Sequence, residues 1–520
     1  METTLRQAAP EQWSADACII FCFAGEDGLP GHAEGVATAM PWLPLAPARA
    51  DFKAQSGKTE VVYNPDTDAA IPRVVLAGLG KRDACTVETL RNAVASALRA
   101  CRARNVARAA LPVAALAAVA PALTDAPAGM SGAELTAFAL EEAAIAAALG
   151  LYRFTAFKTK KDEDADNGAD ALPETLHLFT REAPDDGLKA ALASARAIAA
   201  GVALTRDLVN APPNTATPEH LANAARDLAA CHGFSATILG PDDLSGMGMG
   251  AFEAVFKGSR ESARLIVLEH APAGCEKDKP LILVGKGVTF DTGGISLKPA
   301  AHMQDMKGDM AGAAAVLGAM DAIGGLGVQR RVIGIAPCTE NMPDGGATRP
   351  GDIVTTLAGK TVEIINTDAE GRLILCDALA YALRFEPAAI VDVATLTGAC
   401  VVALGAKVAA VFGNHQGLID AVVETGGRVG DRFWPMPLWD FFFDTLKSDY
   451  ADMKNVGARE GGAIHAAMFL KQFVPDEVPW AHLDIAGPAF ADKGSALTVP
   501  GGTGMAVRTM VGLARGWRAP

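Results

Sequence analysis

The sequence predicts an α/β protein of two domains, an N-terminal α/β domain and a C-terminal α/β domain with a mostly parallel central sheet. Three observations lead to this fold class. The chain has 520 residues, well above the roughly 150 of one typical domain. Short apolar runs alternate with helical patterns along its length. The apolar runs after residue 280 are continuous and β-branched, as in strands that are covered on both faces.

The N-terminal domain is expected over residues 1–185. Its apolar runs predict strands, and the stretches between the runs have helical periodicity. The expected strands are 18–24, 73–78, 106–113 and 176–179, and the expected helices are 86–104 and 131–150. This alternation is typical of an α/β domain.

A linking helix is expected over residues 186–210. The segment is strongly helical and ends at Asn210-Ala211-Pro212-Pro213, where the prolines cannot continue a helix. We therefore place the domain junction in this helix and assign residues 211–520 to the second domain.

The second domain has four buried strands in the prediction, at 281–284, 332–336, 362–365 and 390–393. A loop rich in Gly, Asp, Asn or Thr follows each of them. In open α/β sheets, ligands bind beyond the carboxyl ends of the strands. These loops are therefore the place to look for functional residues.

Composition limits the classes of function. With 46 basic and 60 acidic residues, the net charge of −14 opposes binding to nucleic acid or to an anionic membrane surface. The nine cysteines form no Cys-x-x-Cys pair, so neither a disulfide framework nor a thiolate zinc site is expected. The apolar run 17–23 is too short for a signal peptide. We expect a cytoplasmic protein.

Two segments carry clustered acids and bases directly after predicted strands. The first contains Lys286, Asp291, Lys298 and Asp309, and the second is the octapeptide Asn366 to Leu373, which contains Asp368, Glu370 and Arg372. Asp368 and Glu370 are two apart and are expected on one side of an extended loop. Asp309 is expected on a helix over 303–320, on the same face as Met306.

Charge arithmetic favours a pair of divalent cations at this place. Four carboxylates cannot share a partly dry crevice without neutralisation, and two divalent ions would balance them. Such a pair can activate a water for hydrolysis. Lys298 and Arg372 would remain as free cations that can bind a developing oxyanion or a small anion. The alternative is that each segment is only a set of capped turns with solvated charges.

At these residues the sequence resembles the cytosolic leucyl aminopeptidases, the dimetal M17 peptidases. The octapeptide Asn366 to Leu373 matches the signature of that family, and the spacing of Lys286, Asp291, Lys298 and Asp309 agrees with it. Further matches lie at 207–214, 340–343, 349–352, 394–399 and 482–487. The N-terminal third resembles the family only in its general α/β character.

The resemblance implies an aminopeptidase that removes N-terminal residues, Leu among them. It implies that Asp291 and Glu370 bridge two divalent metal ions and that Asp368 completes one site. Lys286, as a neutral amine, and Asp309 would complete the site of the more loosely bound metal ion. Oxygen-rich ligands with one amine would accept Mn, Zn, Mg or Co, and of these we expect Mn or Zn. Lys298 would polarise the scissile carbonyl, and Arg372 would hold a bicarbonate ion that acts as general base. The pocket for the first side chain is expected to contain Met306, Thr395, Gly398 and Ala486.

The resemblance also implies peptide substrates and a homohexamer. Two positions depart from the family pattern: Thr292 replaces the usual Ser, and Gly308 replaces a bulkier residue. A dimetal hydrolase restricted to dipeptides such as cysteinylglycine would share every catalytic residue. A DNA-binding role is the alternative of a different class, and it would rest on the arginines of one predicted helix and its flank, Arg91, Arg99, Arg102, Arg104 and Arg108.

Overall fold

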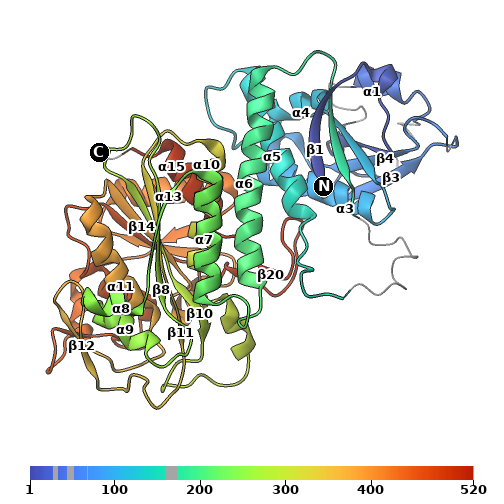
Figure 1. Ribbon diagram of the computed structural model, residues 1–520. Helices are drawn as coiled ribbons and strands as arrows, with labels where there is room; N and C mark the ends of the chain where they lie inside the picture. The colour runs from blue at the N-terminus through green and yellow to red at the C-terminus, as the bar shows by residue number, and fades with distance from the viewer. Residues whose placement is uncertain (27–32, 44–51, 67, 160–171, 519–520) are drawn as a thin grey trace. The chain divides into compact units, whose positions relative to one another are not determined.

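The structure is a computed structural model that describes residues 1–26, 33–43, 52–66, 68–159 and 172–518. The chain forms two compact units. Unit 1 comprises Met1–Ala199 and Lys493–Val499, and unit 2 comprises Ala200–Asp492 and Pro500–Pro520. The long helix α6 (Asp186–Asn210) contains the division between them (Figure 1).

Unit 1 is built on a six-stranded sheet. Its strands are β1 (Glu2–Gln7), β2 (Ala17–Cys22), β3 (Thr59–Tyr63), β4 (Arg73–Gly78), β5 (Arg108–Pro112) and β6 (Thr175–Thr180). The strand order is β1-β6-β5-β2-β4-β3, and only β3 runs antiparallel to its neighbour. The described residues of unit 1 also include the helices α1 (Ala33–Ala39), α3 (Val87–Arg102), α4 (Val113–Val119) and α5 (Gly132–Gly150) and the first part of α6.

The predicted elements of unit 1 are present, and the missed ones have a physical reason. Helix α5 is capped by Ser131, whose hydroxyl accepts from Glu134 N, while the Glu134 carboxylate accepts from Ser131 N, so both hydrogen bonds of a capping box are in place. Strand β2 is buried along its whole length. By contrast, β1 and β3 are the two edge strands and are partly exposed, so they have no continuous apolar run to predict them.

Unit 2 contains a larger sheet and two small ones. The strands of the large sheet are β7 (Ser235–Leu239), β8 (Arg264–His270), β9 (Leu281–Gly285), β10 (Gly287–Asp291), β11 (Val332–Asn341), β14 (Ala389–Ala394), β15 (Ala409–Gly413), β16 (Phe433–Pro435) and β18 (Trp480–Asp484). Their order is β16-β15-β18-β14-β9-β11-β8-β7, with β10 paired to β11. The small sheets contain β12 (Ile353–Thr355), β13 (Thr361–Glu363) and β17 (Met453–Lys454), and β19 (Phe490–Ala491) with β20 (Gly501–Gly502).

Helices cover both faces of the large sheet (Figure 1). One face packs against α7 (Pro218–His232), α10 (Ala311–Leu326) and α13 (Gln416–Val429), and α15 (Val507–Gly516) packs against α10 and α13. The other packs against α9 (Gly250–Phe256), α11 (Gly371–Ala382) and α14 (Gly462–Lys471). The helices α8 (Pro241–Gly246) and α12 (Gly398–Leu404) are short. The four adjacent strands β11, β9, β14 and β18 are mutually parallel, so their carboxyl ends lie at one edge.

Two glycines allow helices to approach this edge closely. A Cβ at Gly312 of α10 would lie 2.1 Å from the carbonyl oxygen of Val393 and 2.9 Å from Lys286 N. A Cβ at Gly371, the first residue of α11, would lie 2.7 Å from Lys286 Nζ. Any larger residue would therefore displace the backbone or the Lys286 side chain.

One predicted strand does not lie in the large sheet. The run 362–365 was expected there, but it forms only the short β13, which pairs with β12 and β17 in a separate sheet. Val362 and Ile364 are buried while Ile365 is 41% exposed, and a four-residue apolar run does not distinguish a central strand from a short peripheral one.

Two helical stretches are long and apolar enough to cross a membrane by length and composition alone, Asp186–Asn210 and Met303–Leu326. The most apolar part of the second is mostly buried within the protein, which is typical of a core helix.

Candidate metal centre

The sequence-predicted acids and bases lie at the carboxyl edge of the large sheet. Lys286 follows β9, Asp291 ends β10, and Thr395 follows β14. Glu370 immediately precedes α11, with helical backbone angles. The ends of three strands and the N-terminus of one helix therefore bring together residues that are far apart in the sequence. The Lys286–Thr395 hydrogen bond, for example, joins residues 109 positions apart.

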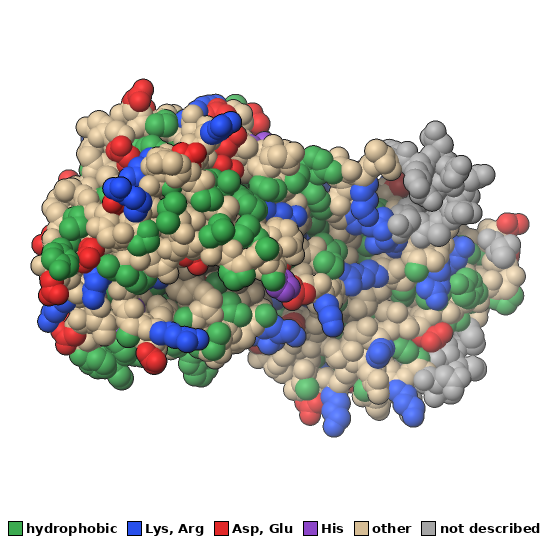
Figure 2. All heavy atoms as spheres, turned by 90° about the horizontal axis from the view of Figure 1, so that it is seen from below, with side chains coloured by type: hydrophobic (Ala, Val, Ile, Leu, Met, Phe, Trp, Pro, Cys, Tyr) green, Lys and Arg blue, Asp and Glu red, His purple; other side chains and the backbone are tan. Residues whose placement is uncertain are grey.

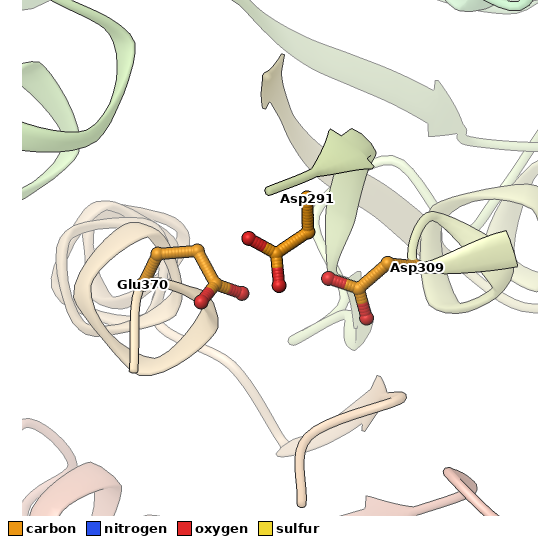
Figure 3. Close-up of side chains that lie close together, drawn as sticks. All are labelled: Asp291, Asp309 and Glu370. Carbon is orange, nitrogen blue, oxygen red and sulfur yellow. The ribbon is translucent and has the colours of Figure 1, made fainter. Parts of the chain in front are cut away.

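Three carboxylates converge at this edge. Figure 3 shows Asp291, Asp309 and Glu370 pointing toward one another, and each offers an oxygen within 4.8 Å of the others. The three residues are 2%, 8% and 2% exposed. Buried carboxylates at this separation repel one another unless cations lie between them, so the group is suited to hold a metal ion.

Two lysines each lie between two carboxylates. Lys286 Nζ is 2.8 Å from Asp309 Oδ2 and 2.8 Å from Glu370 Oε1. Lys298 Nζ is 2.7 Å from Asp291 Oδ2 and 2.5 Å from Asp368 Oδ1. Four negative charges thus face two positive ones. The two ammonium groups lie at two separate places where carboxylates of this edge converge.

Burial and mutual charge shift the pKa values of these groups. Burial raises the pKa of Asp291 to about 6, with Glu370 adding to the effect and Lys298 opposing it. Burial also raises the pKa of Asp309. Burial alone would lower the pKa of Lys286, but the Asp309 and Glu370 carboxylates outweigh this effect and hold the pKa above its ordinary range. The neutral amine that we expected of a Lys286 ligand requires cations beside it, which would reverse the sign of the local field and lower the pKa.

Asn341 orients Asp291, although sequence reasoning assigned it no role. Its Nδ2 donates to Asp291 Oδ1 at 2.8 Å and to the carbonyl oxygen of Thr367 at 3.0 Å. Gly293 N also donates to Asp291 Oδ1, at 2.9 Å. Asp291 Oδ1 is therefore occupied by two donors, and Oδ2 is the oxygen that faces cations. The sequence feature that could have predicted this role is the place of Asn341, a polar residue at the carboxyl end of a buried strand.

Arg372 is buried in the first turn of α11. One of its terminal nitrogens donates to the carbonyl oxygen of Asn455 at 2.8 Å. Its Nε is buried and has no hydrogen-bond partner within the described parts of the chain. Burial lowers the pKa of Arg372 to about 10, with Glu370 and Asp484 opposing the shift. The guanidinium therefore keeps its charge at neutral pH and can bind an anion.

Thr395 and Met306 contact the metal-ligand candidates. Thr395 Oγ1 donates to Asp309 Oδ1 at 2.8 Å, and its carbonyl oxygen accepts from Lys286 Nζ at 3.1 Å. The carbonyl oxygen of Met306 accepts from Asp309 N at 3.2 Å. These two of the four residues expected in the side-chain pocket thus lie directly beside the carboxylate cluster.

The buried Asp484 at the end of β18 organises the other pocket candidates. Its Oδ1 accepts from Leu396 N at 3.2 Å and from Ala486 N at 3.2 Å, and its Oδ2 accepts from Thr397 Oγ1 at 2.6 Å. Gly398 follows at the exposed start of α12. The segment 482–487, which contains Asp484, was one of the matches to the family, but the sequence predicted no role for this carboxylate.

Two local expectations were wrong. Asp309 does not lie on a continuous helix over 303–320, because a 3-10 helix (Met303–Gly308) ends just before it and α10 begins at Ala311. Asp368 and Glu370 do not lie in an extended loop. Asp368 N donates to the Asn366 side chain at 2.9 Å in a tight turn, and Glu370 already has helical backbone angles.

The two departures from the family pattern are accommodated locally. Thr292 keeps the hydroxyl, which donates to the carbonyl oxygen of Asn341 at 2.7 Å. At Gly308, the ring of Phe490 lies 3.4 Å from where a Cβ would be, so an aromatic side chain fills this space from another segment.

The arginines that could have supported DNA binding have protein partners. Arg91 is buried and lies 2.6 Å from Glu142, and Arg108 lies 2.8 Å from Asp16. Arg99 and Arg104 donate to Gly150 O and to the Tyr63 hydroxyl. On the face shown in Figure 2, Lys and Arg side chains are spread over unit 1 with uncharged surface between them. These residues therefore do not form one free basic stripe of the kind that tracks a phosphate backbone.

Comparison with known families gives two matches along the chain. Residues 203–511 match the sequence profile of the catalytic domain of the cytosol aminopeptidase family. Residues 42–161 match the profile of the N-terminal domain of the same family, so the similarity of the N-terminal third goes beyond its general α/β character.

Individual relatives agree with these matches. A probable cytosol aminopeptidase of Nitratidesulfovibrio vulgaris is 52% identical over 513 residues, which cover 98% of each chain. One of Oleidesulfovibrio alaskensis is 49% identical over 99% of this chain and 98% of its own. Among solved structures, the bottromycin maturation enzyme BotP in complex with Mn has a TM-score of 0.80 at 36% identity, covering 96% and 99% of the two chains. A point mutant of tomato leucine aminopeptidase has a TM-score of 0.83 at 32% identity, covering 98% and 96%.

Proposed function

Because the chain belongs to the cytosol aminopeptidase family, we propose that the carboxylate cluster of unit 2 is its two-metal catalytic centre. The protein is an aminopeptidase that hydrolyses the N-terminal peptide bond of peptides, and divalent metal ions are its cofactors. Our proposal concerns the residues that perform this reaction, the anion that assists it, and the choice of substrate.

The two lysine positions between carboxylates are the observation that carries the proposal. Each ammonium group lies 2.5–2.8 Å from oxygens of two different acids, so each pair of acids converges closely enough to share one cation. Asp291, Asp368 and Glu370 would hold one ion, and Lys286, Asp309, Asp291 and Glu370 the other. Two divalent ions would balance the four carboxylates, which two ammonium groups do not.

The bound pair would supply Lewis acidity, lowering the pKa of an attacking water and stabilising negative charge on the carbonyl oxygen. Lys298 would then leave its place between Asp291 and Asp368. Its side chain is 22% exposed, so it can turn toward the substrate. There it would donate to the scissile carbonyl oxygen as negative charge develops on that atom.

Arg372 would hold a bicarbonate ion as general base. The support is its charge and its buried Nε, which has no hydrogen-bond partner among the residues that the structure describes. A bidentate guanidinium contact would orient the anion so that one oxygen remains free to take a proton from water. The anion would then pass this proton to the leaving amine.

Mn or Zn are the metals that we propose, because one similar structure contains Mn and because carboxylate ligands with one amine accept both. The test is chelation followed by readdition of single metals while hydrolysis of a leucine anilide is measured. Activity that returns with Mn or Zn supports the proposal, and full activity after complete metal removal would contradict it.

The substrate range is proposed to include peptides with N-terminal Leu and other residues, with Met306, Thr395, Gly398 and Ala486 around the first side chain. A dimetal hydrolase restricted to dipeptides such as cysteinylglycine is the narrower alternative. Rates on a panel of amino-acid amides, dipeptides and longer peptides separate the two. Turnover of dipeptides alone would favour the alternative.

We also propose a homohexamer in the cytoplasm. Exposed aromatic side chains on unit 2 support self-association: Trp434 at 62%, Trp439 at 62%, Phe441 at 59% and Tyr450 at 78%. All nine cysteines are present as thiols, as in proteins of reducing compartments. Light scattering that detects an active monomer at micromolar concentration would contradict the assembly.

A further inference from the structure

Thr395 contacts two groups that belong to the same proposed metal position. Its hydroxyl donates to Asp309 Oδ1 at 2.8 Å, and its carbonyl oxygen accepts from Lys286 Nζ at 3.1 Å. Asp309 and Lys286 complete one metal position in the proposed function, and the other is completed by Asp368. Within the described part of the chain, no hydrogen bond joins Thr395 to Asp368.

We propose that Thr395 is the positioning residue of the Lys286–Asp309 metal position, an inference that rests on the proposed two-metal function. The resemblance gave this threonine only a place in the side-chain pocket. Its contacts point to a second task, which is to fix the two protein ligands that one metal ion does not share with the other.

The hydroxyl selects which oxygen of Asp309 faces the ion. A carboxylate only accepts, so Thr395 Oγ1 must be the donor and Asp309 Oδ1 the acceptor. This leaves Asp309 Oδ2, which already faces a cation, because it lies 2.8 Å from Lys286 Nζ. Without the hydroxyl, Asp309 could rotate and present either oxygen.

The carbonyl oxygen orients Lys286 in the same way. Three oxygens lie close to the Nζ atom: Asp309 Oδ2 and Glu370 Oε1, both at 2.8 Å as ion pairs, and Thr395 O, which accepts a hydrogen bond at 3.1 Å. As a neutral ligand it keeps two N–H groups and one lone pair. A hydrogen bond to the Thr395 carbonyl oxygen uses one N–H, which leaves the other N–H and the lone pair on the side of the two carboxylates, where the ion would lie.

Thr395 is itself held rigidly, which a positioning role requires. It follows β14 directly, and Ile485 N donates to the preceding carbonyl, that of Ala394, at 2.8 Å. The next two residues donate their backbone N–H groups to Asp484 Oδ1 at 3.2 and 3.4 Å. Groups that orient metal ligands are typically worth about 10- to 100-fold in metal affinity.

The test is Mn binding to metal-stripped protein, followed by titration and by the electron paramagnetic resonance signal of coupled Mn pairs. Thr395→Val removes the hydroxyl at nearly constant volume, and Thr395→Ser keeps it. Thr509→Val is the matched control, because Thr509 Oγ1 also donates to a carboxylate, Asp431 Oδ2 at 2.7 Å, but contacts no metal-ligand candidate.

We expect wild type, Thr395→Ser and Thr509→Val to bind two Mn per chain with similar affinities. Thr395→Val should bind one Mn as wild type does and the second about 10- to 100-fold more weakly, with the coupled-pair signal reduced at equal total Mn. Two unchanged sites in Thr395→Val, equal weakening of both, or a Thr395→Ser variant as weak as Thr395→Val would overturn the inference. Wild-type protein that binds fewer than two Mn would instead overturn the proposed function itself.

Discussion

Replacing Asn341 by Ala should weaken both metal positions, because Asp291 is proposed to bridge them. The change removes the donor at 2.8 Å from Asp291 Oδ1 and the tie to Thr367 O at 3.0 Å. Gly293 N still donates to the same Asp291 oxygen at 2.9 Å, so the carboxylate keeps one of its two donors. A hydrogen bond to a charged group contributes about 1.5–3 kcal/mol. Since about 1.4 kcal/mol corresponds to tenfold in affinity, each metal should bind roughly 10- to 100-fold more weakly.

The assay is competition between the protein and a chelator of known affinity, with circular dichroism to check the fold. Asn414→Ala is the control. Asn414 also makes two hydrogen bonds, donating to Val478 O at 2.9 Å and accepting from Trp480 N at 2.8 Å, but it contacts no metal-ligand candidate. Metal affinity in Asn341→Ala equal to that of Asn414→Ala would refute the idea that Asn341 sets the orientation of Asp291.

Three further predictions concern single residues. Lys298→Ala should lower kcat by about 10²–10³ with both metals retained, since it removes a donor to the transition state; loss of metal instead would place Lys298 in a different role. Arg372→Ala should keep both metals and some turnover but lose its response to bicarbonate, which titration into carbonate-free enzyme measures; stimulation equal to wild type would contradict the assigned anion site. His482 is buried, which lowers its pKa, but Asp392 at 2.5 Å outweighs this and raises the pKa above the ordinary value. The stabilisation that protonated His482 contributes to the folded protein should therefore be complete below about pH 6.5 and be lost as pH rises through the folded-state pKa. In His482→Gln, the free energy of unfolding measured with urea should decrease less over this pH range than in the wild type.

The strands and the acids could be predicted because their signals are local. The runs at 281–284 and 390–393 are buried, central and continuous, and the acids beside them follow the expected edge of the sheet. The run at 362–365 has the same apolar character, yet it lies in a separate sheet. Pairing depends on which strands are neighbours in space, and a short run does not contain this information.

The residues that orient the site were harder to predict because their partners are distant in the sequence. Asn341 bonds to Asp291 across 50 positions and Thr395 to Asp309 across 86. An Asn or Thr at the end of a strand is also common as a turn or cap residue, so its type alone does not assign a role. The prediction of a continuous helix around Asp309 was wrong for a related reason. The segment 303–320 has a helical composition, but the 3-10 helix ends at Gly308, and Asp309 lies in the break where its carboxylate can reach Lys286 and Thr395.

The central claim is that the carboxylates at the sheet edge hold the two metals that hydrolysis requires. Bound metal per chain, measured together with kcat in Asp368→Ala and Glu370→Ala, tests this claim most directly. Either change leaves the remaining acids unable to balance two divalent ions, so we expect fewer than two metals per chain and no measurable hydrolysis, with an unchanged circular dichroism spectrum. A variant that binds two metals and hydrolyses a leucine anilide at the wild-type rate would contradict the account.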